Sequence, residues 1–399
     1  MKLQKRVMVI LAAIAITMAG SMNVQAQNEG LTQTTSLSEN NSDIGTEQAE
    51  PITMVPISNK VVMRKELGTA RVPLIISGDA VVTEVTSNRA DFQAELLDGV
   101  LYVTAQHTAN LPDYSDSIVN FTVKGTNQNL LPFEVSLQIT FEMESKQLVE
   151  DIMEEEISID TKSLSSYDCT IRSNEFDRRL IAQSNLDFSE YTIVCIGDSI
   201  TEGVGLKEGT EALYAYPADL QKILGAGQVL NLGRGGASIA SYWDSFFSSL
   251  EGIPLDADVI IVLGGVNDCY AGNEENIGNI EDCSPGTFYG DADYLMNDLK
   301  NTYPDSLIMF GTPLSTITNQ TYLSFLPNML PLSRYADAIK ELGEKNDIPI
   351  IDMYHERFLD SNDEEIMNQF MYDGVHPNIF GYQLLAEHIA GEMIRLKQE

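Results

Sequence analysis

The sequence is poor in positive charge. Its 399 residues contain 24 Lys and Arg against 59 Asp and Glu, a formal net charge of −35. Nucleic acids and anionic membrane surfaces are bound through basic patches, so this composition argues against both as partners. Four cysteines are too few for a scaffold held together by disulfides. Apolar residues make up 43% of the chain, which is enough for a sizeable buried core.

Long apolar runs are also scarce. One run, over 7–20, follows three basic residues and precedes Val24-Gln25-Ala26. It is too short to span a membrane comfortably, and small residues stand at the usual cleavage spacing. We therefore expect a signal peptide over 1–26, cut after Ala26, and a secreted or cell-surface protein with no membrane span once mature. An uncleaved membrane anchor is the alternative interpretation.

Two regions with different periodicity follow a polar segment. Residues 27–51 have no apolar pattern and are expected to form a flexible linker. Over 52–145, short alternating runs are separated by turn residues, as where Asp98-Gly99 divides 92–97 from 100–104. Such a pair predicts a hairpin, and the whole stretch predicts a small β-sandwich-like accessory domain. Whether this domain binds a ligand or only spaces the next domain is left open.

Residues 146–190 indicate a connector, with a short acidic helix over 146–157 and no clear pattern beyond it. From residue 191 onward, short apolar runs alternate with helical patterns, which is typical of a doubly wound α/β domain with five parallel strands. Strands are expected over 191–196, 228–232, 257–263, 306–311 and 348–353. Helices are expected over 218–224, 238–250, 292–302, 332–345 and 381–397.

Four polar blocks follow strands of this domain or precede its last helix. They are Gly197-Asp198-Ser199, Gly233-Arg234-Gly235-Gly236, Gly264-Gly265-Val266-Asn267-Asp268 and Asp373-Gly374-Val375-His376. Each block alone is compatible with an ordinary turn or helix cap. Because the carboxyl ends of parallel strands meet at one edge of the sheet, the four together predict a single site.

The residue types in these blocks suit acyl transfer. A serine such as Ser199 needs a base to take its proton, and His376 is the candidate base. Asp373, three residues earlier, can hold the other ring nitrogen. The N–H groups of Ser199 and Gly236 and the side-chain amide of Asn267 are the expected donors to an oxyanion.

With these blocks the region from 191 to 399 resembles the SGNH hydrolases, also called the GDSL esterase/lipase family. The resemblance implies a flavodoxin-like fold, hydrolysis of esters or thioesters through an acyl-enzyme, and no metal or other cofactor. It assigns the catalytic roles to Ser199, Asp373 and His376, and the oxyanion hole to Ser199, Gly236 and Asn267. The accessory β region lies outside the resemblance.

Other residues near the expected site have expected or alternative roles. His355, after the fifth strand, is the alternative base, whereas Asp198 and Asp268 are expected to hold loops through backbone N–H groups. A disulfide between Cys269 and Cys283 is expected to close the acidic insertion that follows Asp268. The candidate substrate contacts are Arg234, Trp243, Tyr270 and Phe325.

The expected function is an exported serine esterase that removes short acyl groups, acetyl among them, from carbohydrate. Its substrate would be a small-molecule or polysaccharide ester. A lipase or lysophospholipase-like acylhydrolase is one alternative, although no amphipathic membrane-facing segment is evident. An inactive carbohydrate-binding surface protein is another, against which the intact Ser199, Asp373 and His376 argue. The sequence does not indicate an oligomeric state.

Overall fold

A computed structural model describes residues 51–56, 58–78, 80–97, 99–145, 163–241, 244–281, 284–324, 326 and 328–398. The expected signal peptide, the polar linker and the acidic segment of 146–157 lie outside these residues. Among the helices of the described part, none is both long enough and apolar enough to span a bilayer.

The N-terminal region is built from eight strands. They are β1 (Thr53–Pro56), β2 (Lys60–Arg64), β3 (Thr69–Ser77), β4 (Ala80–Ser87), β5 (Phe92–Leu97), β6 (Val100–Ala105), β7 (Asp116–Asn127) and β8 (Pro132–Glu144). The hydrogen-bonded path runs β4-β7-β8-β2-β3-β6-β5, with β1 added to β3. β4 and β5, at the two ends of this path, contact each other around one apolar core. The half β4-β7-β8-β2 is joined to the half formed by β1, β3, β6 and β5 through a single residue pair, Arg64 with Thr69, and both halves contribute to this core.

The hairpin expected at Asp98-Gly99 is confirmed. Strands β5 and β6 pair antiparallel, with Leu97 opposite Val100. Gly99 has a φ of +79°, a conformation that glycine adopts without strain and that tight hairpin turns require.

The second region contains a five-stranded parallel sheet, as predicted. Its strands are β9 (Thr192–Gly197), β10 (Gln228–Gly233), β11 (Val259–Leu263), β12 (Leu307–Gly311) and β13 (Ile350–Ile351), in the order β10-β9-β11-β12-β13. All five residues of β11 are buried, which explains why it reads as a continuous apolar run. The strand order is that of flavodoxin-like doubly wound folds. Strand β13 is shorter than the predicted 348–353, since only two of its residues pair with β12.

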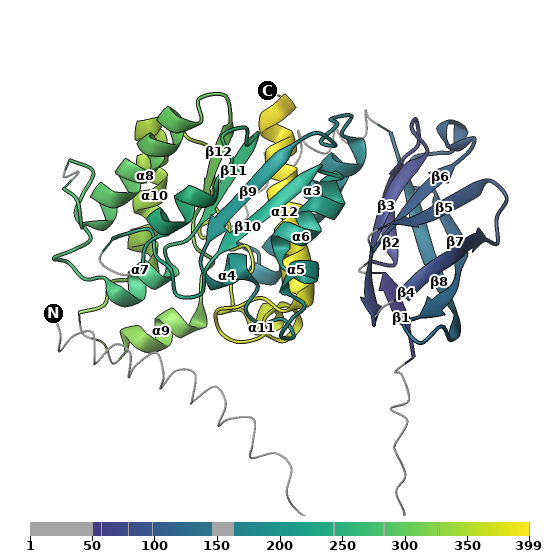
Figure 1. The fold of residues 1–399 in the computed structure, drawn as a ribbon, viewed down its shortest axis with the longest axis horizontal. Coiled ribbons are helices and arrows are strands. Elements are labelled where there is room, and N and C mark those ends of the chain that lie inside the picture. The colour runs from purple at the N-terminus through teal and green to yellow at the C-terminus, as the bar shows by residue number, and fades with distance from the viewer. Residues whose placement is uncertain are drawn as a thin grey trace, which may run out of the picture. The chain divides into compact units, whose positions relative to one another are not determined.

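Helices cover both faces of this sheet (Figure 1). They are α3 (Ser166–Gln183), α4 (Ser199–Glu202), α5 (Glu211–Tyr214), α6 (Tyr216–Leu224), α7 (Val266–Ala271), α8 (Phe288–Thr302), α9 (Ile317–Leu323), α10 (Leu332–Asn346), α11 (Glu364–Phe370) and α12 (Ile379–Gln398). One apolar cluster joins the sheet to α3, α6, α11 and α12, and a second joins its other face to α7, α8 and α10.

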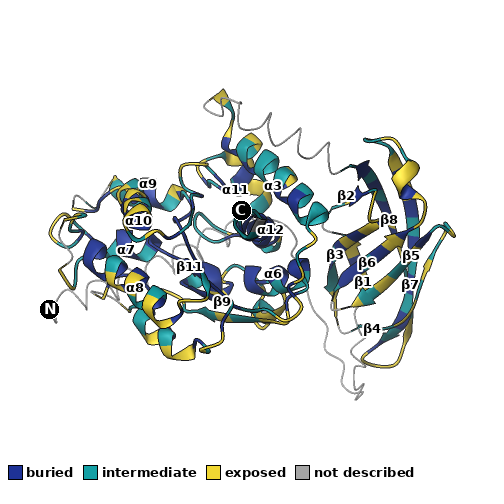
Figure 2. Ribbon diagram, turned by 90° about the horizontal axis from the view of Figure 1, so that it is seen from above, coloured by how far each residue is buried: buried dark blue, intermediate teal, exposed yellow. Residues whose placement is uncertain are grey.

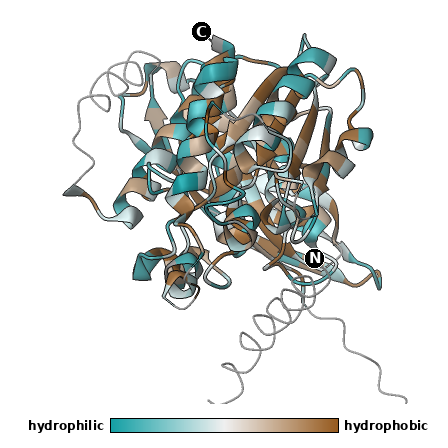
Figure 3. Cartoon of the chain, turned by 90° about the vertical axis from the view of Figure 1, so that its left-hand side faces the viewer, coloured by the Kyte–Doolittle hydropathy of each residue, from teal (hydrophilic) through white to brown (hydrophobic). Residues whose placement is uncertain are grey.

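The apolar residues of this domain gather between the layers. Figure 2 shows the helices buried toward the sheet and exposed on their outer sides, and Figure 3 shows the apolar strands enclosed by helices with hydrophilic outer faces. Helix α10 illustrates the pattern, because its buried residues Leu332, Tyr335, Ala336, Ile339 and Leu342 recur at helical spacing. This packing holds the carboxyl ends of the strands in place for the loops that follow them.

The predicted helix over 238–250 is wrong. Residues 238–241 and 244–245 belong to no helix, residues 242 and 243 lie outside the described part, and a short 3-10 helix, η3 (Phe246–Gly252), follows. The N–H groups of Ile239 and Ala240 donate to Asp268, and that of Ser241 donates to Asp291. Because carboxylates of other elements accept these donors, the backbone does not need helical hydrogen bonds there.

Candidate active site

Ser199 stands at the junction of β9 and α4. The Oδ1 atom of Asp198 accepts the N–H of Ile200 at 2.9 Å and so caps the helix, which confirms the loop-holding role predicted for Asp198. Burial raises the pKa of this carboxyl to about 6. A Cβ at Gly197 would lie 2.1 Å from Thr201 Oγ1 and 2.6 Å from Leu263 O, so only glycine allows the turn this close to β11. The serine is therefore presented at the strand end on a tightly packed turn.

His376 reaches Ser199 from the loop before α12. Its Nε2 lies 2.9 Å from Ser199 Oγ, and its Nδ1 lies 2.9 Å from Asp373 Oδ2. Since Asp373 can only accept at Nδ1 when ionised, Nδ1 carries the proton and the lone pair of Nε2 faces the serine hydroxyl. The side chains of His376 and Asp373 are 18% and 33% exposed, so the pair is reachable from solvent without being free in it.

Asp373 is fixed by its own loop. Its Oδ1 accepts the backbone N–H groups of Val375 at 2.8 Å and His376 at 2.7 Å. Burial works to raise the pKa of Asp373, but the hydrogen bonds that its carboxylate accepts from the His376 ring and from the backbone outweigh it and hold that pKa below its usual range. These hydrogen bonds thus hold the carboxylate in the position from which it orients the imidazole of His376.

Gly236 lies on the loop after β10 and Asn267 in the first turn of α7, and a hydrogen bond ties the two segments together. The Nδ2 atom of Asn267 donates to the carbonyl of Ala237 at 2.8 Å, which leaves the second N–H of the amide for another acceptor. Gly236 has a φ of +77°, and a Cβ built on it meets nothing within 4 Å. The glycine is therefore required for its backbone conformation, and the space in front of it is open.

Asp268 organises the loop that carries these donors. Its buried carboxylate accepts the N–H groups of Ile239 at 3.0 Å and Ala240 at 2.8 Å, which confirms its predicted role. Burial raises the pKa of Asp268 to about 7. Asp291, in the first turn of α8, supports the same loop by accepting from Ser241 and from the N–H of Gly286 at 2.9 Å. Sequence reasoning missed Asp291; its position just after Gly286-Thr287 at a helix start was the available signal.

His355 does not serve as the alternative base in this arrangement. Its Nδ1 lies 2.8 Å from Asp352 and its Nε2 lies 3.0 Å from Asp337, so both ring nitrogens face carboxylates. The imidazole beside Ser199 belongs to His376.

The candidate substrate contacts divide into two groups. Arg234 pairs with Asp244 at 3.1 Å and donates to the carbonyl of Ser245 at 2.7 Å, so its guanidinium is held by these two residues. Tyr270 is half-buried and packs edge-to-face on Tyr322, with ring centroids 5.3 Å apart. Trp243 and Phe325 lie outside the described residues.

The structure contradicts the disulfide predicted between Cys269 and Cys283. Cys269 is a free thiol in the structure, and Cys283 lies outside the described residues. The Cys269 side chain is buried in the apolar layer around α7, α8 and α10, where its Sγ donates to Leu330 O at 3.2 Å and accepts from Asn319 Nδ2 at 3.0 Å. The thiol therefore points into the core and has partners there.

One segment of the chain matches a known family. Residues 195–384 match the GDSL-like lipase/acylhydrolase family model. Similar solved structures include a possible lipase from Chitinophaga pinensis (21% identity, 53% of this chain and 100% of that one, TM-score 0.41). Others are a lipase/acylhydrolase from Enterococcus faecalis (19%, 52% and 96%, 0.39) and a mutant acetyl-xylooligosaccharide esterase from Geobacillus (18%, 51% and 94%, 0.37). A search of curated proteins gave no match. The matched segment contains all five residues of the four blocks that carry the expected chemistry.

Proposed function

This chain belongs, through residues 195–384, to the GDSL-like lipase/acylhydrolase family, and from that premise we propose that it is a serine esterase in which Ser199, His376 and Asp373 form the catalytic triad. The single observation that carries the proposal is the chain of two 2.9 Å contacts from Ser199 Oγ through the His376 ring to Asp373. A hydroxyl in this setting can lose its proton to Nε2 as it attacks a carbonyl carbon.

The proposed acylation step uses the groups on the neighbouring loops. Ser199 Oγ bonds to the ester carbonyl carbon and its proton passes to His376 Nε2. The carbonyl oxygen becomes an oxyanion, and the N–H groups of Ser199 and Gly236 and the free N–H of Asn267 donate to it. As the tetrahedral intermediate collapses, the bond to the alcohol oxygen breaks and the imidazolium gives its proton to the departing alcohol. The acyl group is left on Ser199.

Deacylation repeats these steps with water. His376 takes a proton from the water as its oxygen bonds to the acyl carbon, and returns the proton to Ser199 Oγ when the acyl–serine bond breaks. Asp373 stays ionised throughout and stabilises the imidazolium in both steps. The products are the free acid and the regenerated hydroxyl.

For the substrate we propose short acyl esters, acetyl above all, on a carbohydrate. Polar groups flank the serine: Glu202 is exposed on α4 and its carboxylate lies against Gly235, since a Cβ there would come within 2.7 Å of it. Tyr372, directly before Asp373, is 66% exposed and offers an aromatic face with a hydroxyl. Charged and aromatic groups of this kind suit a sugar better than a lipid chain.

The test is a matched substrate series. The wild type and Ser199→Ala would be assayed on acetylated xylan oligomers and on p-nitrophenyl esters with two, four and eight acyl carbons. We expect the acetyl substrates to have the highest kcat/KM and the variant to lose about 10³-fold or more in kcat. Equal activity of Ser199→Ala would refute the mechanism. A preference for the eight-carbon ester would instead favour a lipase-like acylhydrolase and leave the mechanism intact.

We further propose that the protein is exported and cut after Ala26, on the sequence pattern described above. N-terminal sequencing of the protein recovered outside the cell should begin at Gln27. An N-terminus at Met1 in a membrane fraction would instead indicate an uncleaved anchor.

A further inference from the structure

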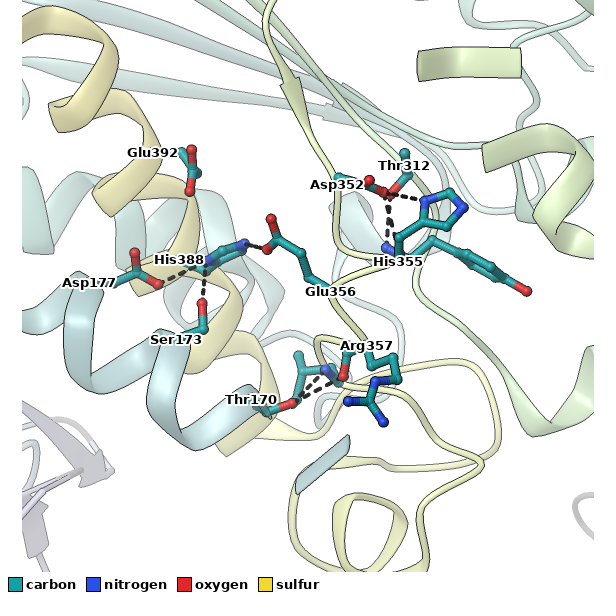
Figure 4. A network of polar contacts seen from close by, with 12 residues as sticks. Thr170, Ser173, Asp177, Thr312, Asp352, His355, Glu356, Arg357, His388 and Glu392 are labelled. Carbon is teal, nitrogen blue, oxygen red and sulfur yellow. Dashed lines mark hydrogen bonds and ion pairs between the residues drawn. The ribbon is translucent and has the colours of Figure 1, made fainter. Parts of the chain in front are cut away.

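A buried polar cluster lies between α3 and α12 and takes no part in the proposed reaction. It consists of Asp177 on α3 and His388 and Glu392 on α12, and one nitrogen or oxygen atom from each lies within 4.8 Å of the others. The side chains of His388 and Asp177 are only 2% and 1% exposed. Figure 4 shows the imidazole of His388 between Asp177 and Ser173 on one side and Glu356 on the other.

Two buried atoms of this cluster have no hydrogen-bond partner. Asp177 Oδ2 lies 2.8 Å from His388 Nδ1, but Asp177 Oδ1 and His388 Nε2 are buried and make no hydrogen bond, and Nε2 has only the longer ion-pair contact with Glu356. Oδ1 lies against Gly391, where a Cβ would come within 2.1 Å of it. Burying such atoms costs free energy unless something binds them. The glycine next to Glu392 thus leaves room for a carboxylate oxygen that no hydrogen bond in the cluster uses.

The surroundings favour positive charge. Glu356 Oε2 lies 3.8 Å from His388 Nε2, so three carboxylates surround one imidazole, with Arg395 paired to Glu392 at 2.8 Å. Three carboxylates therefore face one imidazole and one guanidinium in this cluster.

We propose that Asp177, His388 and Glu392 bind a divalent transition-metal ion, Zn²⁺ above all, that links α3 to α12. One imidazole nitrogen and two carboxylate oxygens belong to the usual zinc ligands, whereas calcium takes six to eight oxygens. The ion replaces the proton on His388 Nδ1, which is released to solvent. Ser173 Oγ, 3.2 Å from Nδ1, or a water molecule completes four ligands.

The geometry needs only a small adjustment. Tetrahedral ligands at about 2.1 Å from zinc lie about 3.4 Å apart, so His388 Nδ1 and Asp177 would separate from their present 2.8 Å by roughly 0.6 Å. The carboxylate of Glu356 facing Nε2 then has a clear role, because histidines that bind metals usually donate their other N–H to such a group. The ion would be structural, since neither Ser199 nor His376 belongs to the cluster.

The experiment uses the full chain without an affinity tag, freed of metal by chelation and desalting. Zinc chloride is titrated by calorimetry, and the Tm is measured with and without zinc. We expect one ion per chain and, at about 100 times the Kd, a rise in Tm of roughly 5 °C or more. Cobalt(II) on the same wild-type protein should give the visible absorption of a tetrahedral N/O site.

Glu392→Gln is the decisive variant, because it removes a ligand and leaves the hydrogen bond between His388 and Asp177 in place. It should lose about tenfold or more in zinc affinity and most of the Tm shift. His355→Gln is the matched control, since His355 also lies between two carboxylates but at the surface, and it should bind zinc like the wild type.

Two outcomes would overturn the proposal. If the wild type binds no stoichiometric zinc, the cluster is an imidazolium ion pair and nothing more. If His355→Gln loses the ion while Glu392→Gln keeps it, the ion binds elsewhere. The Tm of each variant without metal shows whether it folds, and the cobalt spectrum of the wild type needs no variant at all.

Discussion

At the scale of single residues, the proposed reaction depends on Asp373 remaining ionised behind His376. Three N–H groups point at its carboxylate, two from the backbone and one from the imidazole. The effect of these hydrogen bonds exceeds that of burial and lowers the pKa of Asp373. The imidazole is therefore held in one tautomer at every pH at which the serine could react.

Replacing Asp373 by Asn should lower kcat by roughly 10⁴-fold, the loss seen when a chymotrypsin-type triad is changed in the same way. It should also change how stability depends on pH. Because the folded pKa lies below the unfolded value of about 3.9, ionised Asp373 stabilises the fold above that pH, and this contribution disappears as pH falls through the folded pKa.

Denaturant unfolding from pH 3 to pH 7 checks this expectation. The difference in unfolding free energy between the wild type and Asp373→Asn should be constant above about pH 5 and shrink below about pH 4. A difference of the same size at pH 3 as at pH 7 would contradict the lowered pKa.

Gly236 offers a second test at this scale. Alanine at its φ of +77° costs about 1–2 kcal/mol in strain and turns the N–H away from the oxyanion position. We expect Gly236→Ala to lower kcat by roughly 10²-fold while changing KM little. Gly209→Ala is the control, because Gly209 has a similar φ of +83° and equally open surroundings. If both variants lose kcat equally, strain and not the donor explains the effect.

The residues of the candidate site could be proposed from the sequence because each block is local. Ser199, Gly236, Asn267, Asp373 and His376 each lie within a few residues of the end of a strand or of one end of a helix. Cys269 was misread because its direction depends on packing. On α7 it faces the core, and sequence proximity to an acidic loop carries no information about that.

At the scale of elements, residues 239–241 and helix α3 show where hydrophobic periodicity fails to predict the secondary structure. The sequence around 239–241 has a helical pattern, yet Asp268 and Asp291, far along the chain, accept the N–H groups of these three residues. Helix α3 shows the reverse. Its buried positions include Ser166, Thr170, Asn174 and Asp177 at helical spacing, so its inner face is polar and no apolar period is visible. Both cases depend on tertiary partners that a local pattern cannot contain.

The role of Asp291 can be measured directly. Asp291→Ala leaves the N–H groups of Ser241 and Gly286 without their acceptor, and we expect a loss of roughly 2–3 kcal/mol in unfolding free energy together with lower kcat/KM. Asp305→Ala, at an exposed position, should change stability by less than about 0.5 kcal/mol. Denaturant unfolding of both variants is the measurement. Equal stabilities would show that the loop does not depend on this carboxylate.

At the scale of the whole molecule, the change in the periodicity of apolar residues near residue 191 corresponds to separate apolar cores. The alternating pattern of the N-terminal region encloses one apolar cluster, and the continuous runs after residue 191 build a sheet with a cluster on each face. The parallel sheet could be anticipated because buried parallel strands are recognisable as continuous apolar runs, whereas the flavodoxin-like strand order was implied only by the resemblance to the SGNH hydrolases. Strands β1, β2 and β4 could not, since they are short or mostly exposed and have weaker patterns.

The whole account depends on Ser199 carrying the acyl group, and active-site labelling followed by peptide mass spectrometry tests this most directly. After treatment with a fluorophosphonate, the wild type should gain one adduct, on the peptide that contains Ser199. Ser199→Ala should gain none, and His376→Ala should react far more slowly. An active wild type that carries its adduct on another residue, or a Ser199→Ala protein labelled as fast as the wild type, would contradict the account.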